Sequence, residues 1–208
     1  QLVRRGPIEV TDINTAISRV GQDMVQNVAV SFAAREAFKC PPGAACADDL
    51  NALRQRSVKV AAYSYAIAGN SRFRGKADEA MLAGLLHAVG KFYIAMKAAD
   101  HPELFTDRDA LDTLVAQRHT GVARAIVQSW EFPDTIAIGV DEQEQVERDR
   151  IAVADVSDVL FIANHLATNG LASAADLGDV DALARLRISA EDLAALLAEK
   201  AEGARIIN

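Results

Sequence analysis

The chain has 208 residues, of which half are hydrophobic, with a formal net charge of -7 and a pI of about 5.1. Such an acidic chain lacks the basic surface that nucleic acids and anionic membranes attract, so we expect neither as a partner. No apolar stretch approaches the roughly 20 residues of a membrane span, and no apolar core follows the basic N-terminal residues as in a secretory signal, so we expect a cytoplasmic protein.

The composition favours helices, because alanine and leucine dominate the apolar half while only 12 glycines and 5 prolines occur. Every proline falls between apolar-periodic segments, and no segment alternates with a period of two. A near relative of the capping box, Ser189 to Asp192, opens the last segment. The sequence predicts an all-α bundle forming a single domain over residues 1–208, with helices near 12–21, 22–38, 48–68, 79–89, 107–118, 120–131, 134–142, 149–168 and 190–202.

The two cysteines, Cys40 and Cys46, flank a loop that contains Pro41, Pro42 and Gly43. Their spacing matches no zinc pattern and no histidine lies nearby. A disulfide or half of a metal site stays open, but a cytosolic protein favours free thiols.

Polar residues interrupt the apolar faces of two predicted helices. Arg56 breaks the apolar face of the helix over 48–68. In the next helix the small residues Ala80, Ala83 and Gly84 share a face with His87 and Lys91. A face of small side chains predicts the close approach of another helix.

Two more polar residues stand in register with apolar ones further along the chain. His119 is in register with Val122 and Ile126, and Asp155 is in register with Val159 and Ile162. Histidines and a carboxylate on buried faces of separate helices could converge as metal ligands, or could simply hydrogen-bond to one another as core polar groups do. Periodicity leaves both interpretations open.

Five ordered segments resemble a known family. Residues 83–91, read AGLLHAVGK, resemble the helix that gives the HD superfamily its name, G-L-L-H-D-I-G-K. Residues 14–21, 56–61, 119–133 and 154–158 are similar to segments of the HDOD family, the HD-related output domain of bacterial signalling proteins. The resemblance spans roughly residues 12 to 200 and implies a compact HD-like helical bundle. The family usually has further helices before the first segment, so we expect an N-terminal lobe that is absent or truncated here.

Departures from the hydrolase pattern bear on function. Metal-dependent HD hydrolases hold metal through a histidine, the His-Asp pair, further histidines and a final aspartate. Here Arg56 stands at the first histidine and Ala88 replaces the aspartate of the pair, while His87, His119 and Asp155 remain. Lys91 occupies the position that contacts phosphate in catalytic relatives.

The resemblance therefore implies a vestigial site, with no catalytic, metal-binding or cofactor-binding residues and no cofactor. It implies a non-catalytic regulatory module that contacts other signalling proteins or domains, and a homodimer is compatible with it. A guanidinium cannot ligate a metal, so we also expect Arg56 to pair with Asp155 as an internal salt bridge.

Two alternatives stay open. In a divergent phosphohydrolase, Asp141, Glu142 or Asp158 would replace the missing ligands. In a nucleotide sensor without catalysis, Arg56, Lys91 and the basic linker at 72–76 would bind the anion. We expect Trp130 and Phe132 to pack in the core, and the acidic run over 141–147 to form a solvated face.

Overall fold

The computed structural model describes residues 47–70, 77–104, 106–148, 153–178 and 180–206. Throughout these ranges the regular structure is helical, which confirms the all-α prediction. The helices predicted over 12–21 and 22–38, the Cys40–Cys46 loop and the basic linker lie outside the described residues. In the part that is described, no helix is both long and apolar enough to cross a membrane.

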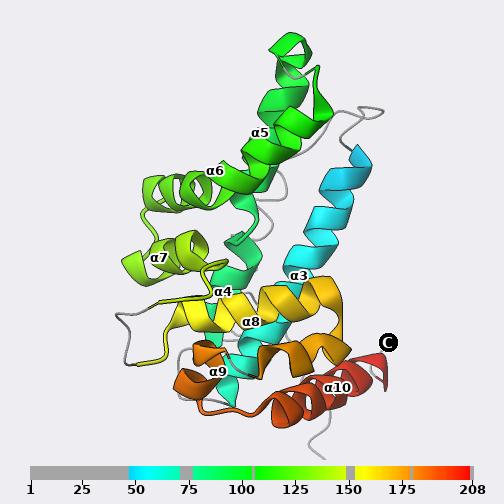
Figure 1. The fold of residues 1–208 in the computed structure, drawn as a ribbon, viewed down its shortest axis with the longest axis vertical. Helices are drawn as coiled ribbons and strands as arrows, with labels where there is room; N and C mark the ends of the chain where they lie inside the picture. The colour runs from blue at the N-terminus through cyan, green and yellow to red at the C-terminus, as the bar shows by residue number, and fades with distance from the viewer. Residues whose placement is uncertain (1–46, 71–76, 105, 149–152, 179, 207–208) are drawn as a thin grey trace, which may run out of the picture.

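A layered arrangement of helices is visible in Figure 1, with α5 and α6 side by side at one end, α8 across the middle and α9 and α10 at the other end. The long α3 runs past α4 and under α8. The elements are α3 (Ala47–Gly69), α4 (Ala77–Leu86), α5 (Val89–Asp100), η1 (Pro102–Leu104), α6 (Arg108–Ser129), α7 (Asp134–Glu142), α8 (Val156–Asn169), η2 (Leu171–Leu177), α9 (Asp181–Leu186) and α10 (Ala190–Ile206).

The centre of the core is α8, which packs against α3, α4, α7, α9 and η2. Its side chains Val159, Leu160, Ile162 and Leu166 are fully buried. Burying each of these side chains contributes roughly 1.5–3 kcal/mol to folding. The central position of α8 also places its polar residues near several other helices at once.

Two glycines allow backbones to touch. A Cβ at Gly84 would lie 2.7 Å from the Cα of Ala61, so α4 contacts the backbone of α3, as the small residues of this face predict. A Cβ at Gly90 would lie 1.9 Å from the carbonyl oxygen of His119, so α5 contacts the backbone of α6. This second contact brings Lys91, the next residue of α5, close to His119.

The helix predicted over 79–89 is wrong at its C-terminal end, because α4 stops at Leu86 and α5 begins at Val89. The His87 Nδ1 lies 2.7 Å from the Gly84 carbonyl oxygen and so binds a carbonyl of the last turn of α4. No glycine or proline marks this break, and α5 was not predicted at all.

The helices predicted over 107–118 and 120–131 are one continuous helix, α6. Gly121 lies inside this helix and does not interrupt it: a Cβ at this position would meet no atom within 4 Å outside the backbone of its own helix, and its φ is not positive. A single glycine costs a helix only about 1 kcal/mol, which the flanking residues offset.

The helix predicted over 149–168 begins later, at Val156, because Asp155 is its N-cap. Asp155 and Asp158 form a capping box in which each carboxylate accepts a hydrogen bond from the other residue's backbone N–H, at 3.1 and 3.2 Å. The predicted cap of the last helix is confirmed, since the Asp192 N–H donates to Ser189 Oγ at 3.0 Å. The short α9 was not predicted.

Candidate functional site

His87 lies buried in the turn between α4 and α5. Its Nδ1–H donates to the Gly84 carbonyl, which leaves the lone pair on Nε2. Burial, with smaller effects from the charges of Arg56 and Lys91, lowers the pKa of His87 to about 3, so its imidazole is neutral near pH 7. The side-chain amide of Gln143 donates to the His87 carbonyl at 2.8 Å and attaches the segment after α7 to this turn.

His119 of α6 is 1% exposed and faces Glu144, which is 43% exposed. Its Nε2 lies 3.1 Å from Glu144 Oε1, and Lys91 Nζ lies 3.4 Å from the same oxygen. A carboxylate accepts only, so His119 donates through Nε2. The hydrogen bond from His119 lowers the pKa of Glu144 to about 2; burial opposes this shift, and the charge of Lys91 adds to it.

Arg56 of α3 reaches α8, where its Nη2 donates to Asn164 Oδ1 at 2.9 Å. Its Nε is buried and has no hydrogen-bond partner. Burial lowers the pKa of Arg56, and the nearby charge of Glu144 partly offsets this. Arg56 therefore lies within electrostatic range of Glu144 and His87 without a direct hydrogen bond to either.

The expected pair between Arg56 and Asp155 is wrong. Asp155 is held instead by Arg148, whose Nη1 donates to Asp155 Oδ1 at 2.7 Å. Asp155 caps the start of α8 while Asn164, the partner of Arg56, lies nine residues further on, about 13 Å along the axis. Arg56 therefore reaches a different part of the helix from the one that the pairing required.

Arg148 is the centre of a second group, which we call the Arg148 network and which consists of Glu142, Arg148, Asp155, Asp158 and Arg185. The Arg148 side chain is 3% exposed and binds Glu142, Asp155 and Asp158, while Arg185 of α9 binds Asp158 at 2.7 Å. Burial alone would lower the pKa of Arg148, but hydrogen bonds and charges from the carboxylates raise it above its ordinary value. The network joins the ends of α7, α8 and α9.

The structure thus separates the predicted site residues into two groups. Arg56, His87, Lys91 and His119 lie together around Glu144, and we call these five residues the central site. Asp155 belongs to the Arg148 network instead. Ala88 is fully buried at the start of α5 and supplies no polar group.

The residues considered as substitute metal ligands are engaged elsewhere. Asp141 binds Arg124 at 2.9 Å, and both Glu142 and Asp158 bind Arg148. Across the described residues, no group of three or more His, Cys, Asp or Glu side chains is placed to hold a metal ion. The central site combines two cations and two imidazoles with one carboxylate, which suits the binding of an anion better than that of a cation.

Sequence reasoning missed Gln143, Glu144, Arg148 and Asn164. The sequence did carry a signal for Asn164, because this polar residue lies four positions after Leu160, at the spacing of one helix face. The structure buries both side chains. Glu144 carried no such signal, because it follows the end of α7 in a segment without helical period. The expectation of a solvated face over 141–147 is therefore wrong for Gln143, which is buried. Glu144 is exposed, as expected, although it also binds His119.

The aromatic pair at the end of α6 is only partly in the core. Phe132 packs against the hydrophobic core, whereas Trp130 is 39% exposed. The two rings meet edge to face with centroids 6.4 Å apart. The expectation of core packing is correct for Phe132 alone.

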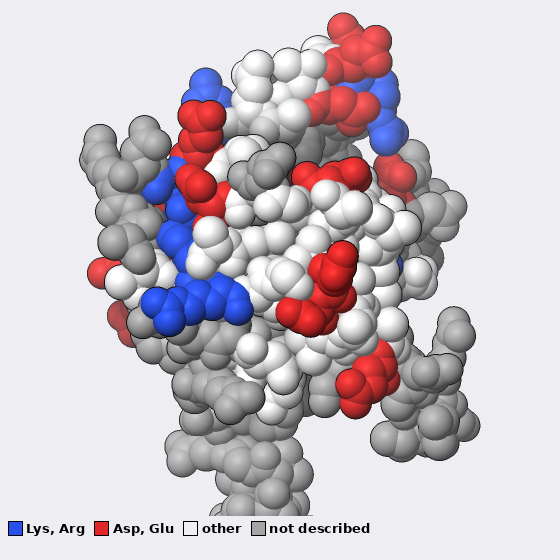
Figure 2. Space-filling model, turned by 60° about the horizontal axis from the view of Figure 1, so that its bottom comes forward, with Lys and Arg blue, Asp and Glu red and all other residues white. Residues whose placement is uncertain are grey.

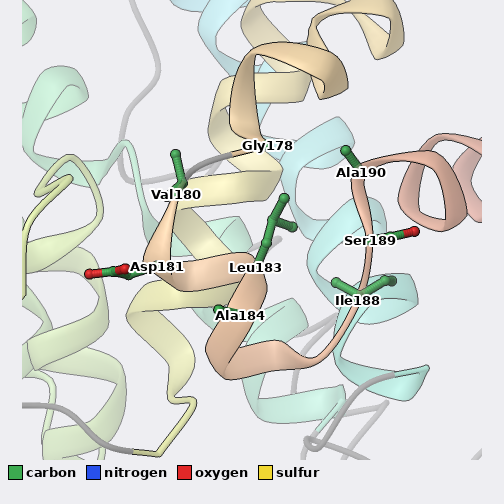
Figure 3. Close-up of a pocket in the computed structure, with 8 residues that line it drawn as sticks. All are labelled: Gly178, Val180, Asp181, Leu183, Ala184, Ile188, Ser189 and Ala190. Atoms are coloured by element: carbon green, nitrogen blue, oxygen red, sulfur yellow. The ribbon is translucent and has the colours of Figure 1, made fainter.

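A separate groove of about 340 Å³ lies between α9 and the start of α10. Figure 3 shows Leu183 between the two segments, with the Asp181 carboxylate and the Ser189 hydroxyl directed to opposite sides. None of the predicted site residues lines it. On the face drawn in Figure 2, Asp and Glu side chains form separate groups with uncharged residues between them, over the part of that face that is described.

Comparison with known proteins identifies the family. One solved structure, the crystal structure of a protein from Shewanella amazonensis SB2B described as a "putative metal-dependent phosphohydrolase", is similar with a TM-score of 0.61 and 21% identity, over 92% of this chain and 74% of that one. At this identity the likeness shows the fold. No curated protein matches the chain. The family model of the HDOD domain matches residues 4–146, which excludes the segment around Asp155. Because this match covers more than half of its length, the chain belongs to the HDOD domain family.

Proposed function

We propose that this chain is a non-catalytic regulatory module that acts through contacts with other signalling proteins. The observation that carries the proposal is the contact of Glu144 with two residues of the central site: a hydrogen bond from His119 and an ion pair with Lys91. The Glu144 carboxylate thus takes up the N–H of His119 and the charge of Lys91, which supports a site that works without a metal ion.

The charges of the central site oppose metal binding. A metal needs lone pairs, but His119 directs an N–H through Nε2 toward Glu144, and Arg56 and Lys91 have none to offer. Each cation close to a divalent ion would repel it by several kcal/mol at a moderate effective dielectric. Hydrolysis of a phosphate ester by an activated water would need such an ion.

The alternative, a divergent metal-dependent phosphohydrolase, rests on the similar fold of the Shewanella amazonensis protein and on the Nε2 lone pair of His87. It would require Glu144 to leave Lys91 and become a ligand together with the two histidines. The surrounding cations make this rearrangement unfavourable, so we retain the regulatory proposal.

Metal analysis tests the proposal. The protein is purified without chelator, its transition-metal content is measured, and turnover of phosphomonoesters and cyclic dinucleotides is assayed with added Mn²⁺ and Fe²⁺. We expect far less than one ion per chain and no turnover above that of a His87→Ala variant. A stoichiometric metal with turnover, both lost in His87→Ala, would contradict the proposal.

Crosslinking in the native cell then tests the protein contact. We expect a signalling protein that binds the purified chain directly, without metal or nucleotide, and whose activity changes on binding. A chain that leaves the activity of every crosslinked protein unchanged would contradict a regulatory role.

A further inference from the structure

The central site has the chemistry of an anion site whose present occupant is a side chain of the chain itself. Arg56 and Lys91 supply positive charge, and His119 donates a hydrogen bond. The one negative group among them is the Glu144 carboxylate. We propose that the central site binds a small phosphate-type oxyanion, and that Glu144 occupies the place of this anion when it is absent. This inference rests on the proposed absence of catalysis, because the anion would be bound and not hydrolysed.

Glu144 uses only part of the donor capacity of the site. Lys91 and His119 both donate to the same oxygen, Oε1. The charge of Glu144 acts on Arg56, but Arg56 donates no hydrogen bond to Glu144, and the buried Nε of Arg56 has no hydrogen-bond partner. A phosphate group has more acceptor oxygens and more negative charge than a carboxylate, and arginine recognises it with paired donors.

Glu144 can leave without unfolding its surroundings. It follows the end of α7, its side chain is 43% exposed, and Lys91 beside it is 24% exposed. The residues on either side of Glu144 are held by contacts that do not involve Glu144: Gln143 donates to the His87 carbonyl, and Arg148 binds Asp155. We therefore expect rotation of the Glu144 side chain alone to make room for an anion.

A tethered carboxylate competes strongly with a free anion, because its effective concentration is of millimolar order. Removing its charge should expose the intrinsic affinity of the site. We therefore compare Glu144→Gln with Glu147→Gln, which removes the same charge at an exposed neighbour. Inorganic phosphate is titrated by calorimetry, in chloride buffer that contains a chelator.

Glu144→Gln should bind phosphate about tenfold more tightly than the wild type. Glu147→Gln should bind like the wild type, and adding Lys91→Ala to Glu144→Gln should remove the gain. In histidine-labelled protein, phosphate should shift the ring signals of the buried His119 and leave those of the exposed His101 unchanged. The wild type should show the same His119 shift at higher phosphate, which keeps the test independent of how well a variant folds.

The proposal is overturned if Glu144→Gln binds phosphate no more tightly than Glu147→Gln, or if phosphate leaves His119 unmoved in the wild type. A second titration with glycerol 2-phosphate distinguishes two classes of ligand. Binding of both anions supports a phosphomonoester as the ligand, and binding of inorganic phosphate alone supports free phosphate. Turnover of a phosphomonoester by protein that carries a stoichiometric metal, measured without chelator, would refute the proposed function. Absence of phosphate binding in an inert, metal-free chain would refute this inference alone.

Discussion

The contact between α5 and α6 at Gly90 gives a prediction whose size follows from the structure. In Gly90→Ala the new Cβ would lie 1.9 Å from the His119 carbonyl oxygen and 2.8 Å from the Ala123 backbone nitrogen. An ordinary contact between carbon and oxygen is about 3.3 Å, so the helices must separate by about 1.4 Å. Both opposing atoms belong to the backbone, and no side-chain rotation can relieve the clash.

Overpacking a core typically costs 1–3 kcal/mol, and a backbone clash belongs at the upper end of this range. Alanine has a higher helix propensity than glycine, which offsets roughly 0.5–1 kcal/mol of this cost. We therefore expect Gly90→Ala to lower the free energy of unfolding by about 2 kcal/mol. Because the separation moves Lys91 away from His119, it should also raise the pKa of Glu144 toward its ordinary value.

Urea denaturation followed by circular dichroism measures the change, provided that the slope with denaturant stays the same. Gly121→Ala is the matched control, since no atom outside its own helix lies within 4 Å of its Cβ position. This variant should be more stable than the wild type by about 0.5–1 kcal/mol. A Gly90→Ala protein within about 0.5 kcal/mol of the wild type would refute the reasoning, because the close contact would then not exist in solution.

Three further predictions concern single residues. The pKa of His87 is about 3 in the folded chain and 6.5 in the unfolded one, so the unfolded state binds the proton more readily below pH 6.5. The free energy of unfolding should therefore fall as the pH is lowered from 6.5 toward 3, with His87 contributing up to about 1.4 kcal/mol per pH unit. A His87 ring signal in NMR that titrates near pH 6.5 would contradict this prediction. Arg148→Met should lower the free energy of unfolding by about 3–5 kcal/mol, because it leaves the buried carboxylate of Asp158 without one of its partners. Arg124→Met breaks an exposed pair and should cost much less, so equal losses in thermal denaturation would argue against a buried network. Asp107→Ala removes the N-cap of α6 and should lower the free energy of unfolding by about 1 kcal/mol in the same assay. An unchanged stability would disprove this prediction.

The sequence predicts the helical class well because the apolar positions recur at helical spacing and the prolines stand outside the helices. It predicts poorly where one side chain decides a boundary. The break after Leu86 depends on the contact of His87 with the Gly84 carbonyl, and the start of α8 depends on the capping box of Asp155. Neither contact has a counterpart in the pattern of apolar residues.

The candidate site shows the same limit. Arg56, His87 and His119 could be found from the sequence, because each is a polar residue at the helical spacing of apolar or small ones, although His87 lies in a turn. The partners could not, because a salt bridge depends on how elements distant in the sequence approach each other. Arg56 was expected to pair with Asp155, but the partner of Asp155 is Arg148. Arg148 comes from a segment whose charged residues look in the sequence like an ordinary solvated surface.

The Arg148 network makes the region of the family match depend on residues that follow it. The family match stops at residue 146, yet Arg148, Asp155, Asp158 and Arg185 all come after it. Through Glu142 they hold the end of α7, from which Glu144 follows two residues later. A chain cut at the family boundary would keep every residue of the central site but lose the counter-charges that fix its carboxylate-bearing segment. We therefore expect the helices after residue 146 to be needed for the position of Glu144, although the family match ends before them.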